Sequence, residues 1–394
     1  MVLNKSEFSS RVHKIDNELD AMEARIDWPG RLTPNNLDQV WQSFCASGFK
    51  TSPDLTYDDI SDDIGDLRAQ ILSLDVHDMG EPLLEPLMIE KQGELERQIE
   101  LVSQRDKPDF VLASLDLFGK ITDGLLDRAR DIRDKVPVME PDPRDADADA
   151  VIEIAEQEMR WYAERCERFD QKVIKFPHPG TQLFTSQGNL NVACDYKVPC
   201  GRIIPLLAHE IGTHTVTRHN GKMQPLQVLE CGLAGYDRLQ EGLAVFAEYV
   251  CGYLPAERLR VLAARVEAAH MTAGGNSLAD IFSCLYDDYK LDEHVAFTTA
   301  ARAKRGGGLT KDALYLRGLV ELLDYLRDGG DFEMLFIGKF ALKQHDTLKK
   351  MIQDGMLHPP KVLPRYLDLP HAVNRLNRAR ALDVTQFYQD IPET

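Results

Sequence analysis

The sequence predicts an α+β protein that is predominantly helical and contains a small sheet. Apolar residues recur at helical spacing through most of the 394 residues. Residues 182–196, in contrast, alternate loosely around a Gly-Asn break, which is typical of short strands or a hairpin. The composition, 43% hydrophobic and 28% charged, is that of a globular chain long enough for roughly two to three domains.

The first part of the chain, residues 1–135, is expected to be a helical N-terminal region. Residues 16–26 and 89–101 combine helical apolar spacing with many charges. Residues 136–150 contain three prolines and four aspartates, with no bulky apolar residue after Met139. This composition predicts a linker or a long surface loop.

The remaining residues, 151–394, are expected to form the functional core. Its small sheet should include residues 183–193, and the chain should be mainly helical from residue 202 onward. Later helices have readable starts: Ser277 precedes one and is followed by Asp280 in a capping-box pattern. Thr310 precedes another, which should stop at a Gly-Gly pair.

Charge and cysteine usage narrow the possible functions. The formal net charge of −18 disfavours nucleic acids and anionic membrane surfaces as partners. Seven scattered cysteines without a C-x-x-C pair argue against a disulfide framework or a cysteine zinc ribbon. The first residues lack the apolar stretch of a secretory signal, and no apolar run approaches the ~18 residues of a membrane span. We therefore expect a cytoplasmic protein.

The most informative segment is a predicted helix at residues 205–221. It contains His209, Glu210 and His214, which form the pattern H-E-x-x-x-H. On a regular α-helix, residues five apart point about 140° away from each other, so two such histidines would not share a metal ion. A π-type turn widens the helix by one residue and removes this obstacle. We therefore expect a π-bulge at residues 211–213, eased by Gly212, and a helix stop at Asn220-Gly221.

A second helix, predicted at residues 237–252, offers the third ligand. Glu241 and Glu248 lie seven residues apart and are able to point the same way. Glu241 is the preferred ligand, because the adjacent Gly242 would let this helix approach the first one. Glu248 is kept as the runner-up, or as a residue that contacts a ligand. Asp237 and Gln240 resemble a capping box at the start of the helix.

Two histidines and one glutamate leave a tetrahedral Zn²⁺ with an open position, as in catalytic zinc sites. We expect one zinc ion per chain, which would lower the pKa of its bound water and polarise a carbonyl. Glu210 would take the water proton and deliver it to the leaving amine. The pattern thus predicts metal-assisted amide hydrolysis, against the alternative of a helix that carries these residues by chance.

A glycine-rich segment further along the chain offers candidates for substrate binding. Gly306–Lys311 lacks the residue order of a phosphate loop, so a flexible loop or lid hinge is the better interpretation. Arg302, Arg305 and Lys311 are candidates for holding a substrate carboxylate. Tyr315 is a candidate for steadying the oxyanion during catalysis. The alternative is that all four are ordinary surface residues.

Several motifs together resemble one known family. They are LLAHEIGTH at residues 206–214, QEGLA at residues 240–244 and RGGGLTKD at residues 305–312. Bacterial members are called QEGLA-motif proteins and are described as flavohaemoglobin expression modulators. The eukaryotic relatives include the microtubule-associated tyrosine carboxypeptidase. The resemblance is densest over residues 185–326.

The resemblance implies a zinc metallopeptidase with a gluzincin-like core at residues 151–394. It implies His209, His214 and Glu241 as zinc ligands and Glu210 as the catalytic base. The expected function is that of a carboxypeptidase that removes C-terminal residues, tyrosine-type or glutamate, from a protein or peptide. An endopeptidase, an aminopeptidase, or a regulatory protein with a non-catalytic metal site are the alternatives.

Overall fold

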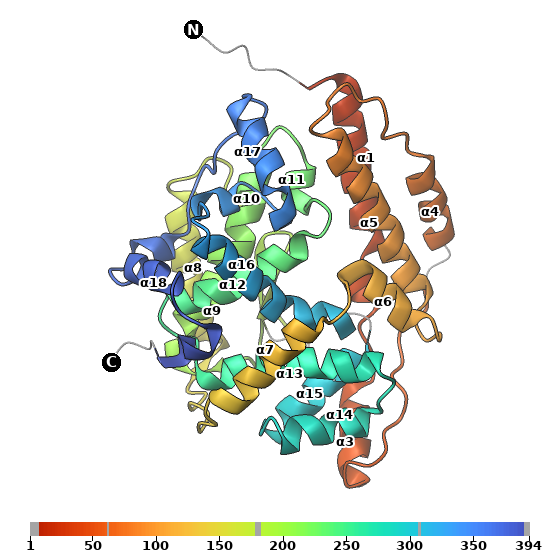
Figure 1. Ribbon diagram of the computed structural model, residues 1–394, viewed down its shortest axis with the longest axis vertical. Helices are drawn as coiled ribbons and strands as arrows, with labels where there is room; N and C mark the ends of the chain where they lie inside the picture. The colour runs from red at the N-terminus through yellow and green to blue at the C-terminus, as the bar shows by residue number, and fades with distance from the viewer. Residues whose placement is uncertain (1–7, 61–62, 178–182, 306–308, 390–394) are drawn as a thin grey trace. The chain divides into compact units, whose positions relative to one another are not determined.

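The computed structural model describes residues 8–60, 63–177, 183–305 and 309–389, and it is predominantly helical with two small sheets (Figure 1). The predicted α+β class is confirmed at this level. The chain forms two compact units. Unit 1 comprises residues 1–16, 140–255 and 318–394, and unit 2 comprises residues 17–139 and 256–317.

Unit 2 is built from helices. They are α2 (Trp28–Arg31), α3 (Leu37–Ala46), α4 (Asp63–Ser73), α5 (Glu85–Ser103), α6 (Phe110–Phe118), α7 (Asp123–Lys135), α13 (Ala256–Ala273), α14 (Leu278–Asp287), α15 (Glu293–Lys304) and a 3₁₀ helix, η3 (Leu309–Ala313). Most of α1 (Ser10–Ile26) belongs here too. Part of the core is an aromatic cluster in which the Phe44 and Phe282 ring centres are 5.1 Å apart.

Unit 1 contains both sheets and the remaining helices. Its elements are β1 (Ala146–Asp147), α8 (Ala148–Ala163), β2 (Val173–Phe176), β3 (Leu183–Ser186), β4 (Asn189–Ala193), β5 (Lys197–Val198), α9 (Ile203–His209), a π-helical segment (Glu210–Thr215), α10 (Val216–Lys222), α11 (Val228–Cys231), α12 (Tyr236–Val250), α17 (His345–Gln353) and α18 (Ala372–Ala379), with short 3₁₀ helices at Cys200–Arg202, Glu333–Phe336, Leu342–Gln344, Arg365–Asp368 and Val384–Gln389. Helix α16 (Leu314–Arg327) begins in unit 2 and runs into unit 1.

The border between the units at residues 139 and 140 lies inside the segment that the sequence marks as a linker or loop. Chain order did not reveal that residues 256–317 group with the N-terminal helices. Two contacts within unit 2 show how they do so. Arg130 on α7 pairs with Glu267 on α13 at 2.9 Å, and Arg260 donates to the carbonyl of Val136 at 2.8 Å.

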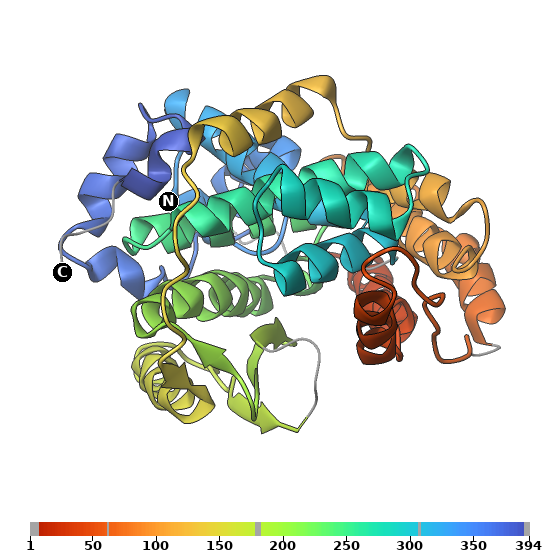
Figure 2. The same cartoon turned by 90° about the horizontal axis from the view of Figure 1, so that it is seen from below.

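The three-stranded sheet of unit 1 has the order β2-β4-β3, with β4 parallel to β2 and antiparallel to β3. The hairpin expected at residues 183–193 is confirmed, and its turn places Gln187 (φ 49°) and Gly188 (φ 80°) in the left-handed region. Thr215 Oγ1 donates to the carbonyl of Gly188 at 2.9 Å, which ties the hairpin to the π-helical segment. Figure 2 shows the strands beside α8 and beneath the helix that contains this segment.

Several predicted helix ends need correction. The capping box of Ser277 and Asp280 is confirmed at the start of α14. The one expected at Asp237 and Gln240 is wrong, because α12 begins at Tyr236, directly after Gly235 with φ 76°. The helix expected after Thr310 begins at Leu314, since residues 309–313 form a 3₁₀ helix.

The helix ends at Lys222, one residue past the predicted stop at Asn220-Gly221, and Asn220 also connects it to distant segments. The side chain of Asn220 is fully buried and donates to the carbonyls of Phe336 and Val362 at 2.7 and 2.8 Å. Its Oδ1 accepts from the backbone N–H groups of Lys361 and Val362. These bonds attach the C-terminal part of unit 1 to the helix that carries the histidines.

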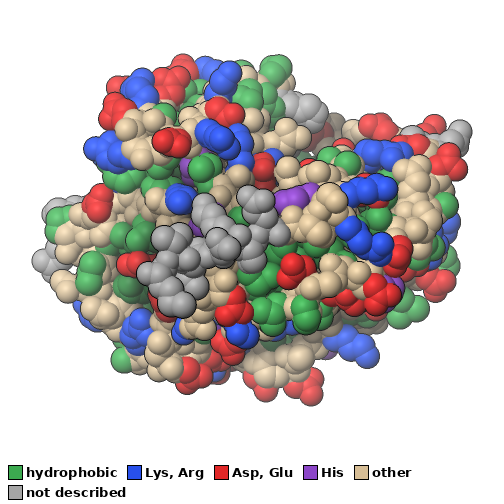
Figure 3. All heavy atoms as spheres, turned by 90° about the horizontal axis from the view of Figure 1, so that it is seen from above, with side chains coloured by type: hydrophobic (Ala, Val, Ile, Leu, Met, Phe, Trp, Pro, Cys, Tyr) green, Lys and Arg blue, Asp and Glu red, His purple; other side chains and the backbone are tan. Residues whose placement is uncertain are grey.

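The structure also bears on membrane spans and on surface charge. Every helix among the described residues is too short or too polar to cross a membrane. On the face shown in Figure 3, acidic and basic side chains are interspersed. Residues 306–308, where the sequence favours a flexible loop or lid hinge, lie outside the described residues.

Candidate metal centre

The histidine-bearing helix contains the predicted π-turn. Helix α9 passes without a break through the π-helical segment at Glu210–Thr215 into α10. Thr213 Oγ1 donates to the carbonyl of Ala208, five residues back, at 3.1 Å. Gly212 is required inside this turn, because a Cβ atom there would lie 2.9 Å from the ring of Tyr366. The sequence prediction of a π-bulge is confirmed, and the segment is longer than the expected residues 211–213.

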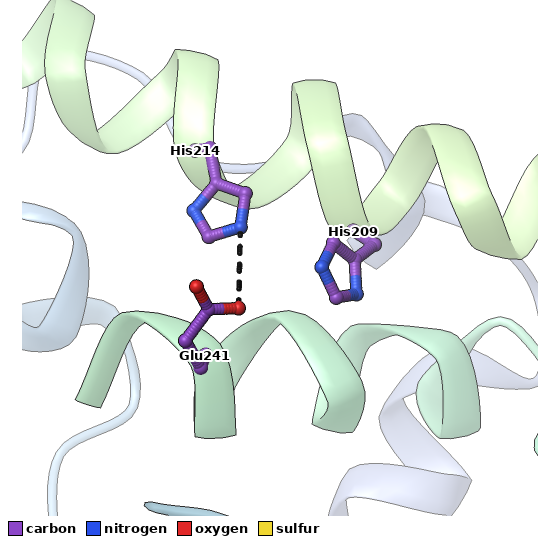
Figure 4. Close-up of side chains that lie close together, drawn as sticks. All are labelled: His209, His214 and Glu241. Atoms are coloured by element: carbon purple, nitrogen blue, oxygen red, sulfur yellow. Dashed lines mark ion pairs between the residues drawn. The ribbon is translucent and has the colours of Figure 1, made fainter. Parts of the chain in front are cut away.

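The π-turn brings both histidines to one side of the helix, where they face Glu241 on α12 (Figure 4). One ligand atom from each of His209, His214 and Glu241 lies within 4.8 Å of the other two. His214 Nε2 is 3.9 Å from Glu241 Oε2, and the two imidazole ring centres are 5.2 Å apart. These three side chains could hold a metal ion.

Helix α12 also fixes the orientation of both imidazoles. His209 Nδ1 lies 2.9 Å from Glu248 Oε1, and His214 Nδ1 lies 3.4 Å from Gln240 Oε1. Both partner oxygens are acceptors, so each Nδ1 carries the proton and donates it. In the neutral form of each ring, Nε2 then keeps the lone pair that binds a metal, as in metal sites where the histidine donates its other N–H to a neighbouring acceptor.

Burial shifts the pKa values of His214 and Glu210 in opposite directions, and both shifts favour the neutral form. Burial lowers the pKa of His214 to about 3, so this ring is uncharged near neutral pH. Burial also raises the pKa of Glu210, whose Oε1 is 4.0 Å from His209 Nε2. Burial alone would lower the pKa of His209, but the hydrogen bond to Glu248 and the nearby carboxylates raise it overall.

Glu248 is fully buried, and its carboxylate contacts His209 and Arg202. Besides His209, its Oε2 lies 3.6 Å from Arg202 Nη2. A buried carboxylate requires such partners. The residue that the sequence left as runner-up ligand thus contacts His209, whereas Glu241 is the acid in the three-residue group.

The expected role of Gly242 is wrong. A Cβ atom at this position would clash with the backbone of Gly318 on α16, and a Cβ atom at Gly318 would clash with the carbonyl of Arg238. The glycine pair therefore lets α12 approach α16, not the histidine-bearing helix. Sequence analysis also missed Gln240 as the partner of His214, because its polar side chain looked like a cap.

The proposed substrate-binding residues belong to unit 2, whereas the three-residue group belongs to unit 1. Arg302 makes a forked ion pair with buried Asp312. Arg305 is 9% exposed. Their roles at a substrate stay predictions.

Lys311 and Tyr315 also have aromatic or cationic neighbours in unit 2. Lys311 Nζ is 5.9 Å from the ring centre of Trp28. Arg265 lies over the ring of Tyr315, 4.8 Å from its centre. The oxyanion role of Tyr315 stays a prediction as well.

Comparison with known proteins places the chain in a family of carboxypeptidases. The model of the family described as "Microtubule-associated tyrosine carboxypeptidase" matches residues 42–383, and the chain belongs to this family. No curated protein matches the chain. Among solved structures, a protein described as a lipoprotein of unknown function from Shewanella oneidensis is similar at 14% identity. That match covers 80% of this chain and 73% of the other, with a TM-score of 0.39, too low to bear on fold or function.

Proposed function

We propose that this chain is a zinc-dependent carboxypeptidase with a gluzincin-like core, which removes C-terminal residues from a protein or peptide. The observation that carries the proposal is the convergence of His209, His214 and Glu241 within 4.8 Å. Membership of a carboxypeptidase family supports the same reaction class.

The donor set fits zinc. Two imidazole nitrogens and one carboxylate oxygen are a common ligand set of catalytic zinc. In a tetrahedral site, two ligand atoms that are each about 2.0–2.2 Å from zinc lie about 3.3–3.6 Å apart. The observed spread of up to 4.8 Å would therefore close by roughly 1.2–1.5 Å on binding, through rotation of the side chains.

Bound zinc would supply a water molecule of lowered pKa and polarise the scissile carbonyl. Glu210 is the proton carrier of the chain itself. Its carboxylate lies beside His209, and burial raises its pKa. A carboxylate of raised pKa accepts a proton more readily, so Glu210 takes it from the attacking water and passes it to the leaving amine.

An edge strand is available for the peptide. Among the described strands, β3 pairs with β4 alone. Thr185 of β3 donates from Oγ1 to the carbonyl of Glu210 at 3.2 Å, so the strand runs beside the proton carrier. An extended substrate that adds to this edge by backbone hydrogen bonds would pass the site.

The substrate is a C-terminal tyrosine-type residue or glutamate in this proposal. Arg302, Arg305 and Lys311 remain the candidates for the terminal carboxylate, and Tyr315 for the oxyanion. The cytoplasmic setting expected from the sequence stays part of the proposal.

Peptides of varied C-terminal residue test the proposal when they are incubated with the zinc-loaded chain and read by mass spectrometry. We expect stepwise loss of C-terminal residues from free acids and no cleavage of the matching C-terminal amides. Glu210→Gln should lower the rate by about 10²–10⁴-fold and keep its zinc. Internal or N-terminal cleavage would establish a different peptidase. Zinc binding without cleavage of any peptide would favour a regulatory protein with a non-catalytic metal site.

A further inference from the structure

Unit 2 contains a second cluster of charged side chains, far apart in the sequence. Arg265 comes from α13, Arg302 from α15, Arg305 from the residue after α15, and Asp312 from η3. The three elements pack against one another. All three guanidinium groups lie close enough to affect the charge of the single carboxylate.

The acid in this cluster is already paired. Arg302 donates from Nε and Nη2 to the two oxygens of Asp312, at 2.8 and 2.6 Å. Asp312 is 2% exposed. The geometry is the bidentate fork that guanidinium groups form with carboxylates.

The other two guanidinium groups have buried N–H groups without acceptors. Nε of Arg265 and Nε of Arg305 have no hydrogen-bond partner in the described part of the chain. Arg305 as a whole is 9% exposed. Three guanidinium groups thus act on the carboxylate of Asp312, and a buried N–H group without an acceptor is unfavourable.

Among the described residues, Asp312 is the carboxylate that acts on both Arg265 and Arg305. Burial raises the pKa of Tyr57 to about 12, so this phenol beside Arg305 is neutral. Arg105 stacks over the Tyr57 ring at 4.8 Å, and its own acid is Asp106. Burial, followed by the charge of Arg302, lowers the pKa of Arg305 to about 10, which still leaves it positive near neutral pH.

We propose that Arg265, Arg302 and Arg305 form a binding site for a carboxylate that comes from outside the chain. Asp312 shows that a carboxylate fits the fork of Arg302. The side chain of Arg302 is 30% exposed, so the cluster reaches solvent. The carboxylate is that of a peptide, from its C-terminus or from an acidic side chain. That the carboxylate belongs to a peptide rests on the proposed function, whereas its binding to the arginines of unit 2 is measured without turnover, so the two proposals can fail separately.

Fluorescence anisotropy with Glu210→Gln protein tests the proposal without turnover. The probes are a labelled oligoglycine with a free C-terminus, its C-terminal amide, and an amide with one internal glutamate; inorganic phosphate serves as competitor. We expect Arg305→Gln and Arg265→Gln to weaken binding of the carboxylate probes by about tenfold or more. Arg68→Gln, which removes a half-exposed charge elsewhere in unit 2, should leave it unchanged.

The free-acid peptide and the glutamate peptide identify the source of the carboxylate. If the site recognises a single source, only the peptide that carries it binds more tightly than the plain amide. Equal affinity for all three peptides, or equal affinity of Arg305→Gln and Arg68→Gln, overturns the proposal. Thermal unfolding without peptide separates binding from architecture. Arg305→Gln should leave the midpoint unchanged or raise it, because an unpaired buried charge is removed; a clear drop would mean a structural role and would overturn the site.

Discussion

The histidine–glutamate group of unit 1 and the arginine cluster of unit 2 both bury polar groups, but the first gathers acceptors and the second gathers donors. In unit 1, both Nδ1 atoms are bonded to α12, and lone pairs of Nε2 and of Glu241 converge. In unit 2, three guanidinium groups act on one carboxylate, and Nε of Arg265 and Nε of Arg305 have no acceptor among the described residues. Clustered acceptors suit a cation, whereas clustered donors suit an anion. The comparison therefore predicts a cation for the first cluster and an anion for the second.

Among the predicted effects, the loss of zinc on removal of one zinc ligand should be the largest. His214→Ala takes away one of three donors, so we expect zinc content to fall from one equivalent to background, together with peptidase activity. The control is His219→Ala on the same helix, because His219 packs against Phe169 and is outside the three-residue group. Zinc retained by the first variant, or lost equally by both, would remove His214 from the site.

Asp312→Asn should have the next largest effect, on the stability of unit 2. Burial opposes ionisation, but the charges and hydrogen bonds of Arg302, with the charges of Arg265 and Arg305, hold the pKa of Asp312 well below its ordinary range. Its contribution is therefore present above the ordinary carboxyl pKa of about 4 and is lost as the pH falls below it.

Loss of one partner of a buried pair costs about 3–5 kcal/mol, so urea unfolding at pH 7 should show Asp312→Asn to be destabilised by that order. Its stability should also change less than that of the wild type between pH 5 and pH 2.5. If the two proteins lose stability in parallel on acidification, Asp312 is not a buried ionised group.

Smaller losses of zinc affinity should follow when the hydrogen bonds to the Nδ1 atoms of the two histidines are altered. Glu248→Gln and Gln240→Leu each loosen one imidazole, and we expect zinc affinity to fall by about 10–100-fold, as for other partners of metal-bound histidines. Glu248→Gln should be the more severe, because its carboxylate makes the shorter bond, 2.9 Å against 3.4 Å. Chelator competition measures both constants, and wild-type affinity in both variants would show that α12 does not orient the rings.

Local sequence determined the features that depend on spacing along one element. The five-residue separation of His209 and His214 required a widened turn, and the structure has one. The hairpin at residues 183–193 and the capping box at Ser277 follow from turn and cap chemistry, which operates within a few residues.

Features that depend on tertiary contacts could not be predicted in this way. Gly242 looked like a contact for the histidine helix, yet its partner is Gly318, 76 residues along the chain. Asn220 lies at the predicted end of its helix, but its side chain also binds backbone groups more than 110 residues away. Polar and small residues have the same local signature whether they end a helix or join two distant segments, so only the fold distinguishes the two.

The central claim is that His209, His214 and Glu241 bind one zinc ion, and X-ray absorption at the zinc edge tests it most directly. On the chain loaded with one equivalent of zinc, the account predicts only nitrogen and oxygen donors at about 2.0–2.2 Å, with an imidazole signal that disappears in His214→Ala. Sulfur donors at about 2.3 Å from any of the seven cysteines, or a spectrum unchanged in the variant, would contradict it.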